Sequence, residues 1–360
     1  MKLNVDERLK LIKEVGEEIL TEDELVNRLI EKETLTAYDG FEPSGRIHIA
    51  QGLLRAINVN KLIKAGVHFK FLVADWYALM NNKMGGDLSK IKTVGEYFIE
   101  VWKVCGMDMK NVEFIWASDL MNDQAYWLMV LQIGRLNTVP RITRCSQIMG
   151  RTENDNLTAA QIFYPCMQAS DIFMLNVDIA QLGMDQRKVN VLAREVAEKI
   201  GRRKPIAIHH HMLMGLTEPK DKELTGVDAT IAKKMSKSNP DSAIFMTDSK
   251  EEIERKFKKA YCPEGIVQDN PVLEYCKYII FEKIDEFAVK RSEKFGGDVI
   301  YKSYEDLEKD FVDKKLHPMD LKATSAQYIN QFIEPVREHF KKNVNAKELL
   351  EKVESFQVTR

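Results

Sequence analysis

A short polar loop at Lys234 to Ser238 (KMSKS) places two ammonium groups and two hydroxyl groups within five positions. Pro240 closes it on the C-terminal side. These groups suit a reaction in which negative charge builds up on a triphosphate and little covalent chemistry falls to the protein. A solvated Lys/Ser loop would give the same letters, because short motifs carry a false-positive risk. The functional interpretation therefore needs a matching element elsewhere in the chain.

A glycine-bearing turn near the start of the chain supplies that element. Residues 34–39 predict a strand, residues 40–46 a turn, and residues 48–65 a helix. A strand, a turn and a helix N-terminus in this order present backbone amides and a positive dipole end to a phosphate. His48 would stand there as a hydrogen-bond donor, although a lone histidine can equally be a cap or a core contact.

Strands and helices alternate beyond this turn. Further strands are predicted at residues 67–74, 112–117, 177–180 and 205–209, with helices at 88–104 and 186–200 and a mainly helical insertion at about 119–175. This order predicts an open, mostly parallel, doubly wound (Rossmann-like) α/β sheet. Ligands of such sheets bind at the carboxyl ends of the strands. His48, Asp75 and the 234–238 loop would lie at that edge.

Two helical regions flank the sheet in this prediction. Residues 1–33 form an N-terminal helical extension, residues 34–248 the catalytic domain, and residues 249–360 an all-helical second domain. The expected helices of the second domain lie near 250–260, 271–282, 304–313, 320–341 and 346–355.

A polar stripe crosses an apolar segment of the insertion. Tyr164, Gln168 and Asp171 are spaced i, i+4 and i+7, so they share one face of a helix. Such a stripe joins a buried polar network or reads a polar ligand; an exposed polar face is the other reading. Pro165 predicts that the helix begins or bends there.

Composition describes an ordinary globular chain of 360 residues with 44% hydrophobic residues and a net charge of −2. Polyanions must therefore be held by local basic patches. Five cysteines without a Cys-x-x-Cys pair favour a reducing compartment. No signal peptide or membrane span is evident, so a cytoplasmic location is expected. Three consecutive histidines from His209 alternate in direction on a strand and cannot converge on a metal.

With both signatures present, the sequence resembles the class I aminoacyl-tRNA synthetases. Residues 48–51 stand for their "HIGH" element and residues 234–238 are their "KMSKS" loop. The closer resemblance, from about residue 34 onward, is to the tyrosyl-tRNA synthetases of the archaeal and eukaryotic cytosolic type. It rests on YDG at 38–40, YP at 164–165 with Gln168 and Asp171, DQRK at 185–188, FGGD at 295–298 and HPMDLK at 317–322.

This resemblance implies a tyrosine pocket. Tyr38 and Asp171 would bind the phenol hydroxyl, and the α-ammonium group would be held by Tyr164, Gln168 and Gln186. Asp75 is a weaker candidate for the rim. Phenylalanine would leave the carboxylate and the phenol unpaired, which can be worth a factor on the order of ten thousand.

The implied reaction has two steps. Tyrosine and ATP give tyrosyl-adenylate and pyrophosphate, and the tyrosyl group then passes to the terminal ribose of the tRNA. Lys234, Lys237 and His48 would stabilise phosphate charge, and Mg²⁺ would accompany the pyrophosphate. The implied ATP contacts are Gly45, His48, Ala50, Lys234, Met235, Ser236, Lys237 and Ser238. Ala50 and Gln51 depart from the idealised signature, and Gln51 receives no catalytic role.

Tyrosine tRNA is the implied macromolecular partner. Arg187 would lie near the first acceptor base pair, while Phe295, His317 and Asp320 would read the first anticodon base. Core packing is the other reading of Phe295. Basic clusters at 141–151, 202–204 and 255–259 are candidates for backbone contacts. A homodimer joined through residues 119–160 is also implied.

Three alternatives stay open. Tryptophanyl-tRNA synthetases share both nucleotide elements, but an indole offers nothing to a carboxylate at the end of a phenol-sized slot. A small-molecule nucleotidyltransferase of the same superfamily would have no use for residues 249–360. A non-catalytic tRNA-binding paralogue would not require His48 and both lysines of the loop.

Overall fold

The computed structural model describes residues 3–150, 156–219, 233, 235 and 240–356. In this part of the chain, one sheet has the strand order β1-β6-β5-β2-β3-β4. The strands are β1 (Gly16–Leu20), β2 (Leu35–Phe41), β3 (Val67–Val73), β4 (Val112–Trp116), β5 (Ile179–Gly183) and β6 (Ile206–His210). Neighbouring strands are parallel except β1 and β6, which are antiparallel. The predicted mostly parallel α/β sheet is confirmed.

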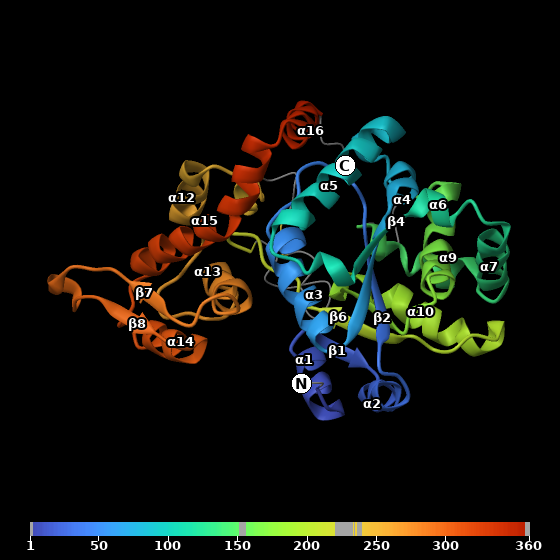
Figure 1. Ribbon diagram of the computed structural model, residues 1–360, viewed down its shortest axis with the longest axis horizontal. Helices are drawn as coiled ribbons and strands as arrows, with labels where there is room; N and C mark the ends of the chain where they lie inside the picture. The colour runs from blue at the N-terminus through green and yellow to red at the C-terminus, as the bar shows by residue number, and fades with distance from the viewer. Residues whose placement is uncertain (1–2, 151–155, 220–232, 234, 236–239, 357–360) are drawn as a thin grey trace.

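Helices cover both faces of this sheet. Figure 1 shows α3 and α5 on one side and α9 and α10 on the other. The helices of this part are α3 (Arg55–Lys64), α4 (Asp75–Met80), α5 (Leu88–Val104), α6 (Ala117–Leu120), α7 (Gln124–Arg135), α8 (Val139–Thr143), α9 (Ala159–Met174) and α10 (Arg187–Ala197). Because both faces are covered, the inner strands are buried; Phe69 and Phe71 of β3 are fully enclosed.

Two helix starts depend on local chemistry. The helix predicted from His48 begins with a π-helical turn (Ala50–Leu54), in which the Leu54 amide donates to the Ile49 carbonyl at 3.1 Å. Helix α9 begins at Ala159 rather than at Pro165, because Thr158 caps it and Gln161 completes the capping box. The proline lies inside α9, so of the two expected outcomes, a helix start or a bend at Pro165, the helix start is excluded.

The N-terminal extension is not wholly helical. It contains α1 (Val5–Lys13) and α2 (Glu22–Glu31), but β1 between them pairs with β6 at the edge of the sheet. This strand is only five residues long and gains its hydrogen bonds from a partner nearly two hundred residues away. Local periodicity could therefore not reveal it.

The C-terminal region is mainly helical and lies beside the sheet domain (Figure 1). Its helices are α12 (Lys250–Lys259), α13 (Pro271–Tyr275), α14 (Tyr304–Val312), α15 (Pro318–Lys342) and α16 (Val344–Ser355). A small antiparallel pair, β7 (Phe287–Val289) and β8 (Val299–Tyr301), corrects the all-helical prediction. Strands of three residues are too short to show an alternating pattern. None of the described helices has the length and apolar character that would cross a membrane.

Candidate active site

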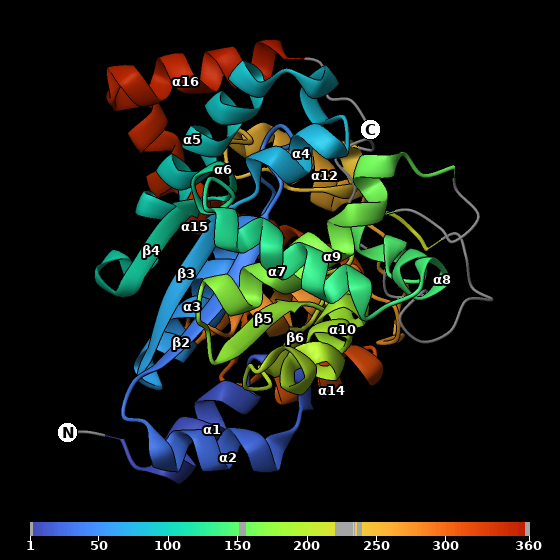
Figure 2. The ribbon, with the colours of Figure 1, turned by 90° about the vertical axis from the view of Figure 1, so that its right-hand side faces the viewer.

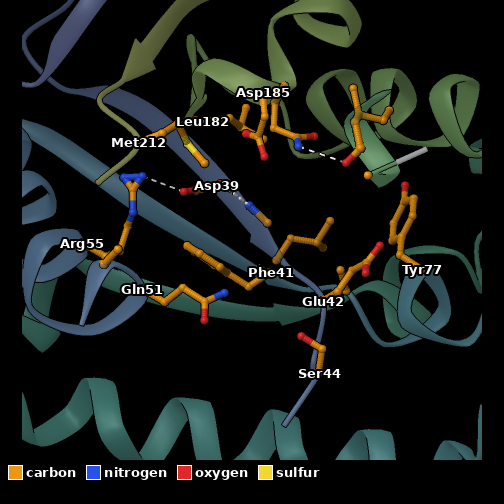
Figure 3. Close-up of a pocket in the computed structure, with 18 of the residues that line it drawn as sticks. Asp39, Phe41, Glu42, Ser44, Gln51, Arg55, Tyr77, Leu182, Asp185 and Met212 are labelled. Carbon is orange, nitrogen blue, oxygen red and sulfur yellow. Dashed lines mark hydrogen bonds and ion pairs between the residues drawn. The ribbon is translucent and has the colours of Figure 1, made fainter. Parts of the chain in front are cut away.

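A cavity of about 420 Å³ opens at the carboxyl ends of β2, β5 and β6 (Figure 3). This is the edge at which an α/β sheet binds its ligands. The structure brings most of the predicted pocket residues to this cavity. Those that line it are Tyr38, His48, Ala50, Tyr164, Gln168, Asp171, Gln186 and Met235.

The polar stripe of α9 points into a buried network. The hydroxyl of Tyr77 donates to Asp171 Oδ2 at 2.6 Å, and the hydroxyl of Tyr126 donates to Oδ1 at 2.8 Å. Burial raises the pKa of Asp171 to about 8, while the two phenol hydrogen bonds act in the opposite direction. Tyr77 and Tyr126 were not predicted as site residues. The only signal for them in the sequence was a phenol hydroxyl among apolar residues.

Tyr38 lies on strand β2 and faces Asp171 of helix α9. Its side chain is 1% exposed, and its hydroxyl makes no hydrogen bond of ordinary geometry among the described residues; the Gln168 amide is near enough only to oppose the rise of its pKa. Burial and then the nearby charge of Asp171 raise the pKa of this phenol well above its usual range. A buried hydroxyl without a partner costs free energy unless a ligand satisfies it. Tyr38 and Asp171 therefore offer a polar end to an otherwise largely apolar slot.

The other wall of the cavity carries amide and carboxylate groups. Tyr164 donates to Glu42 Oε1 at 2.6 Å, and Gln168 donates to Gln186 Oε1 at 3.0 Å. Gln186 in turn donates to the carbonyl of Ile148 at 3.1 Å. Oxygen acceptors gathered in this way suit an ammonium group. Glu42 was not predicted, although it follows the strand directly within the turn.

Asp75 does not reach the cavity. It is fully buried at the start of α4, where Oδ1 accepts from the amides of Trp76 and Ser118 at 3.0 and 2.9 Å. Asp75 joins the start of α4 to α6, so the structure does not place it on the rim. Its position at the carboxyl end of β3 misled the prediction.

The helix start that carries His48 contacts the segment that follows the KMSKS loop. His48 forms an isolated β-bridge with Phe245, and the Ile49 amide donates to the Ile244 carbonyl at 2.8 Å. Lys234, Ser236, Lys237 and Ser238 lie outside the described residues. Met235 between them is buried, lines the cavity and accepts a 3.7 Å hydrogen bond from Tyr275 at Sδ. Met235 and the described segment after the loop, at Ile244 and Phe245, thus lie on the side of the cavity that holds His48.

The predicted nucleotide turn itself is tightly built. Gly45 has a φ of +89°, a conformation that favours glycine. Gly45 does not line the cavity, whereas its neighbour Ser44 does. Gly52, one turn into the helix, would place a β-carbon 2.4 Å from the Met246 sulfur, so this helix and the segment after the KMSKS loop approach as closely as a glycine permits.

A buried charged network lies beneath the nucleotide side of the cavity. Arg55 donates to Asp39 Oδ2 at 2.6 Å (Figure 3). It also donates to Gln181 Oε1 at 2.5 Å, and its Nη2 lies 3.0 Å from His210 Nδ1. Burial raises the pKa of Asp39 to about 6, against the effect of Arg55. This network was not predicted, although Asp39 is a charged residue within a predicted strand, which is a signal visible in the sequence.

Among the described residues, no cluster of three or more His, Cys, Asp and Glu side chains could hold a metal. The three histidines of the His209 run have separate partners: His209 contacts Glu18, His210 contacts Arg55, and His211 contacts Glu17. Carboxylates do line the cavity singly, at Asp39, Glu42 and Asp185.

The candidate tRNA contacts lie in two places. Arg187 begins α10 beside the cavity, where its Nε pairs with both oxygens of Glu18 at 3.0 and 2.8 Å. His317 caps α15 and accepts from the Met319 amide, with Asp320 one turn further on. The side chain of Phe295 lies outside the described part of the structure.

A half-buried arginine side chain links the loops that carry Phe295 and His317. Arg291 donates from Nε to the Gly297 carbonyl at 2.6 Å and from Nη1 to the Lys315 carbonyl at 2.8 Å. The two carbonyls, eighteen positions apart in sequence, are thereby held at one surface of the C-terminal region.

Comparison with known proteins agrees with this geometry. The sequence matches the family model described as tRNA synthetases class I (W and Y) over residues 31–334. It is 53% identical to a protein of Arabidopsis thaliana named tyrosine--tRNA ligase 1, cytoplasmic, over all of this chain and 91% of that protein. A tyrosine--tRNA ligase of Saccharolobus islandicus is 42% identical over 99% of this chain and 100% of its own length.

A solved structure gives the same result. The tyrosyl-tRNA synthetase of Pyrococcus horikoshii, crystallised with L-tyrosine, has a TM-score of 0.91 and 40% identity over 97% of this chain and all of that chain. The chain belongs to the class I aminoacyl-tRNA synthetases. Within that class it is a member of the tyrosyl-tRNA synthetase family, as its motifs predicted.

Proposed function

We propose that this chain acts as a tyrosine–tRNA ligase that converts L-tyrosine and ATP into tyrosyl-adenylate and pyrophosphate and then transfers the tyrosyl group to the 3′ end of tyrosine tRNA. The observation that carries this proposal is the unpartnered hydroxyl of Tyr38 opposite Asp171. A phenol hydroxyl bound between them would satisfy both groups. The relatives named above, including the tyrosine complex, support the same substrate.

The pocket would bind the two ends of tyrosine differently. Asp171 and Tyr38 would receive the phenol hydroxyl, and Tyr164, Gln168 and Gln186 would surround the α-ammonium group. Glu42 adds a carboxylate on the ammonium side, since Tyr164 holds it at 2.6 Å. Fixing both ends of tyrosine would direct its carboxylate toward the nucleotide side of the cavity, which converts binding into orientation.

The first step forms one bond and breaks one. A carboxylate oxygen of tyrosine attacks the α-phosphorus of ATP, and the bond from that phosphorus to the bridging oxygen of the leaving pyrophosphate breaks. No protein nucleophile is needed. His48, Lys234 and Lys237 would stabilise the phosphate charge that develops, and the pairing of His48 with Phe245 supports their approach. In the second step a terminal ribose hydroxyl of the tRNA attacks the tyrosyl carbonyl, and AMP leaves.

Mg²⁺ would enter as part of the ATP substrate. It would neutralise charge on the β- and γ-phosphates, as Mg²⁺ does with other nucleotides. Single carboxylates and water would complete its coordination, in keeping with the scattered acidic residues of the cavity.

A homodimer is proposed through the insertion. Helix α7 leaves large apolar side chains exposed, among them Leu128 at 57% and Leu131 at 62%, and Val139 of α8 is 61% exposed. Figure 1 places α7 at the outer edge of the sheet domain. An apolar surface of this kind marks an interaction site, and a second copy of the chain would cover it.

For tRNA recognition, we assign Arg187 to the first acceptor base pair and Phe295, His317 and Asp320 to the first anticodon base. The bridge made by Arg291 supports the second assignment, because it gathers both loops at one surface. The cytoplasm is the proposed location, in line with the name of the Arabidopsis relative.

The decisive experiment is amino-acid-dependent ATP–pyrophosphate exchange without tRNA, with tyrosine, tryptophan and phenylalanine in parallel. Exchange with tyrosine alone, lost in Asp171→Ala, is the expected result. Exchange with tryptophan would replace the proposed substrate. Silence with all three in folded, ATP-binding protein would overturn the proposal and leave the paralogue or the small-molecule transferase.

A further inference from the structure

The start of helix α10 carries a closed ring of hydrogen bonds that begins and ends on the same helix. Arg187 pairs with Glu18 of β1, Glu18 with His209 of β6, and His209 with Asn190, one turn further along α10. The three links measure 2.8, 2.7 and 3.0 Å. Arg187 and Asn190 are three positions apart, so they share a face of the helix.

The inner half of the ring is rigid. His209 and Asn190 are fully buried. The amide nitrogen of Asn190 can only donate, so it fixes His209 Nε2 as an acceptor and leaves the ring proton on Nδ1, which donates to Glu18. Burial lowers the pKa of His209, in keeping with this neutral tautomer. The hydrogen bond from His209 thus holds the Glu18 carboxylate in one position.

In the outer half of the ring, Arg187 uses only its Nε to contact Glu18. Both Glu18 oxygens contact Nε, at 3.0 and 2.8 Å, whereas the two terminal nitrogens make no hydrogen bond within the described part of the chain. The side chain is 39% exposed. An arginine fork has five N–H donors, so four of them remain available to a ligand. Gln186, the preceding residue, lines the tyrosine cavity.

We infer that Glu18 of the N-terminal extension is a positioning residue, which holds Arg187 so that its terminal N–H groups read an acceptor-bearing base edge of the tRNA acceptor stem. The inference rests on the proposed function, because it assumes that Arg187 meets the acceptor stem.

The net charge of the Arg187–Glu18 pair indicates that its ligand is a base edge and not a phosphate. Glu18 neutralises the charge of Arg187 within the ring. Burial acts to raise the pKa of Glu18, but the contacts with Arg187 and His209 outweigh it and lower this pKa, so Glu18 remains a carboxylate. The pair has little net charge left to attract a phosphate, but it retains directed donors. Base edges are read by such donors, whereas phosphate contacts depend on net charge and therefore on salt.

The test is a double-mutant cycle on tRNA charging. Glu18→Ala, Arg187→Ala and the double variant are compared by kcat/KM for tRNA, each divided by its own pyrophosphate-exchange rate. Each single substitution should lower this ratio on the order of tenfold and reduce discrimination against tRNAs with a changed first base pair. The double variant should be no worse than Arg187→Ala, because Glu18 acts through Arg187.

A second ion pair between the N-terminal extension and α10 serves as the control. Glu24 of the extension contacts Arg194 of α10 at 2.7 Å, away from the cavity. Glu24→Ala should leave both activities as they are. Glu18→Gln keeps an oxygen for Nε but removes the charge, so it should increase the salt dependence of tRNA binding while weakening first-pair discrimination.

Each contrary result has a distinct meaning. Additive losses in the double variant, or equal losses in Glu24→Ala, would show that Glu18 only stabilises the fold and would overturn the inference. A normal ratio in Glu18→Ala with a lowered ratio in Arg187→Ala would overturn it while leaving the proposed function intact. Wild-type protein that fails to charge tRNA would overturn the proposed function itself.

Discussion

Tyr77 and Asp171 are joined by a 2.6 Å hydrogen bond at the closed end of the cavity. Tyr126 holds the other oxygen of the same carboxylate. Asp171 is therefore oriented before any ligand arrives. Tyr38, on the opposite side, has a buried hydroxyl without a partner. One half of the proposed phenol-binding site has its hydrogen bonds within the protein, and the other half does not.

This asymmetry predicts opposite effects for two Tyr→Phe substitutions. Tyr38→Phe removes a buried polar atom that has no partner, so Tm should stay the same or rise, while KM for tyrosine should increase about tenfold. Tyr77→Phe breaks an existing bond to a buried carboxylate, so it should destabilise the fold by about 1–3 kcal/mol. Thermal unfolding and pyrophosphate exchange measure both. A lower Tm in Tyr38→Phe would show that its hydroxyl is already satisfied without ligand.

The buried pair of Arg55 and Asp39 predicts a large stability effect below the nucleotide site. Arg55→Met leaves an uncompensated carboxylate and should lower the free energy of unfolding by about 3–5 kcal/mol. Adding Asp39→Leu should recover part of that loss. Urea denaturation would measure the series, with Lys13→Met as the control, since the exposed Lys13–Glu22 pair should contribute less than about 1 kcal/mol. Equal losses in both pairs would contradict this account.

Whether a site residue could be predicted depends on whether its signal is local in the sequence. Tyr164, Gln168 and Asp171 could be grouped in advance because helical spacing is a local property, and α9 brings them to the cavity. Tyr77 could not be assigned, because its contact with Asp171 spans ninety-four positions and two elements. Asp75 follows a strand as a ligand residue would, but its local amide contacts take it into the core.

Strands show the same limit. Strand β3 was predicted to within one residue. Its seven residues alternate at first and are then wholly apolar and buried in the second half of the strand, which is a local pattern. Strand β1 forms only where β6 lies beside it, and β7 and β8 stabilise each other. Pairing between distant segments is decided by tertiary structure, which a single sequence does not display.

His211 predicts a pH-dependent contact between three regions. It lies between Glu17 of β1 and Glu274 of α13, at 2.5 and 3.0 Å, and stacks on Tyr278. Burial disfavours the charged ring, but the two carboxylates outweigh it and raise the pKa of His211 to about 9. A raised histidine pKa gives stability that is complete below about pH 6.5 and is lost as pH rises through about 9.

The measurement is urea denaturation of the wild type and His211→Gln at pH 7 and pH 10. The difference in unfolding free energy between the two proteins should be large at pH 7 and should shrink at pH 10. Other groups that titrate in this range affect both proteins and cancel in the difference. A constant difference would show that His211 stabilises the fold by packing on Tyr278 and not by its charge.

Arg291 predicts a tRNA defect that originates far from the chemistry. Because it holds the Gly297 and Lys315 carbonyls together, Arg291→Ala should let the loops that carry Phe295 and His317 separate. KM for tRNA should rise about tenfold and discrimination against a changed first anticodon base should fall, as expected when a base-reading surface is lost. Lys302→Ala, an exposed neighbour on the other side of β8, provides the control. Steady-state charging of tyrosine tRNA and of an anticodon variant measures both quantities. If Arg291→Ala charges the two tRNAs as the wild type does, these loops do not form the anticodon-reading surface.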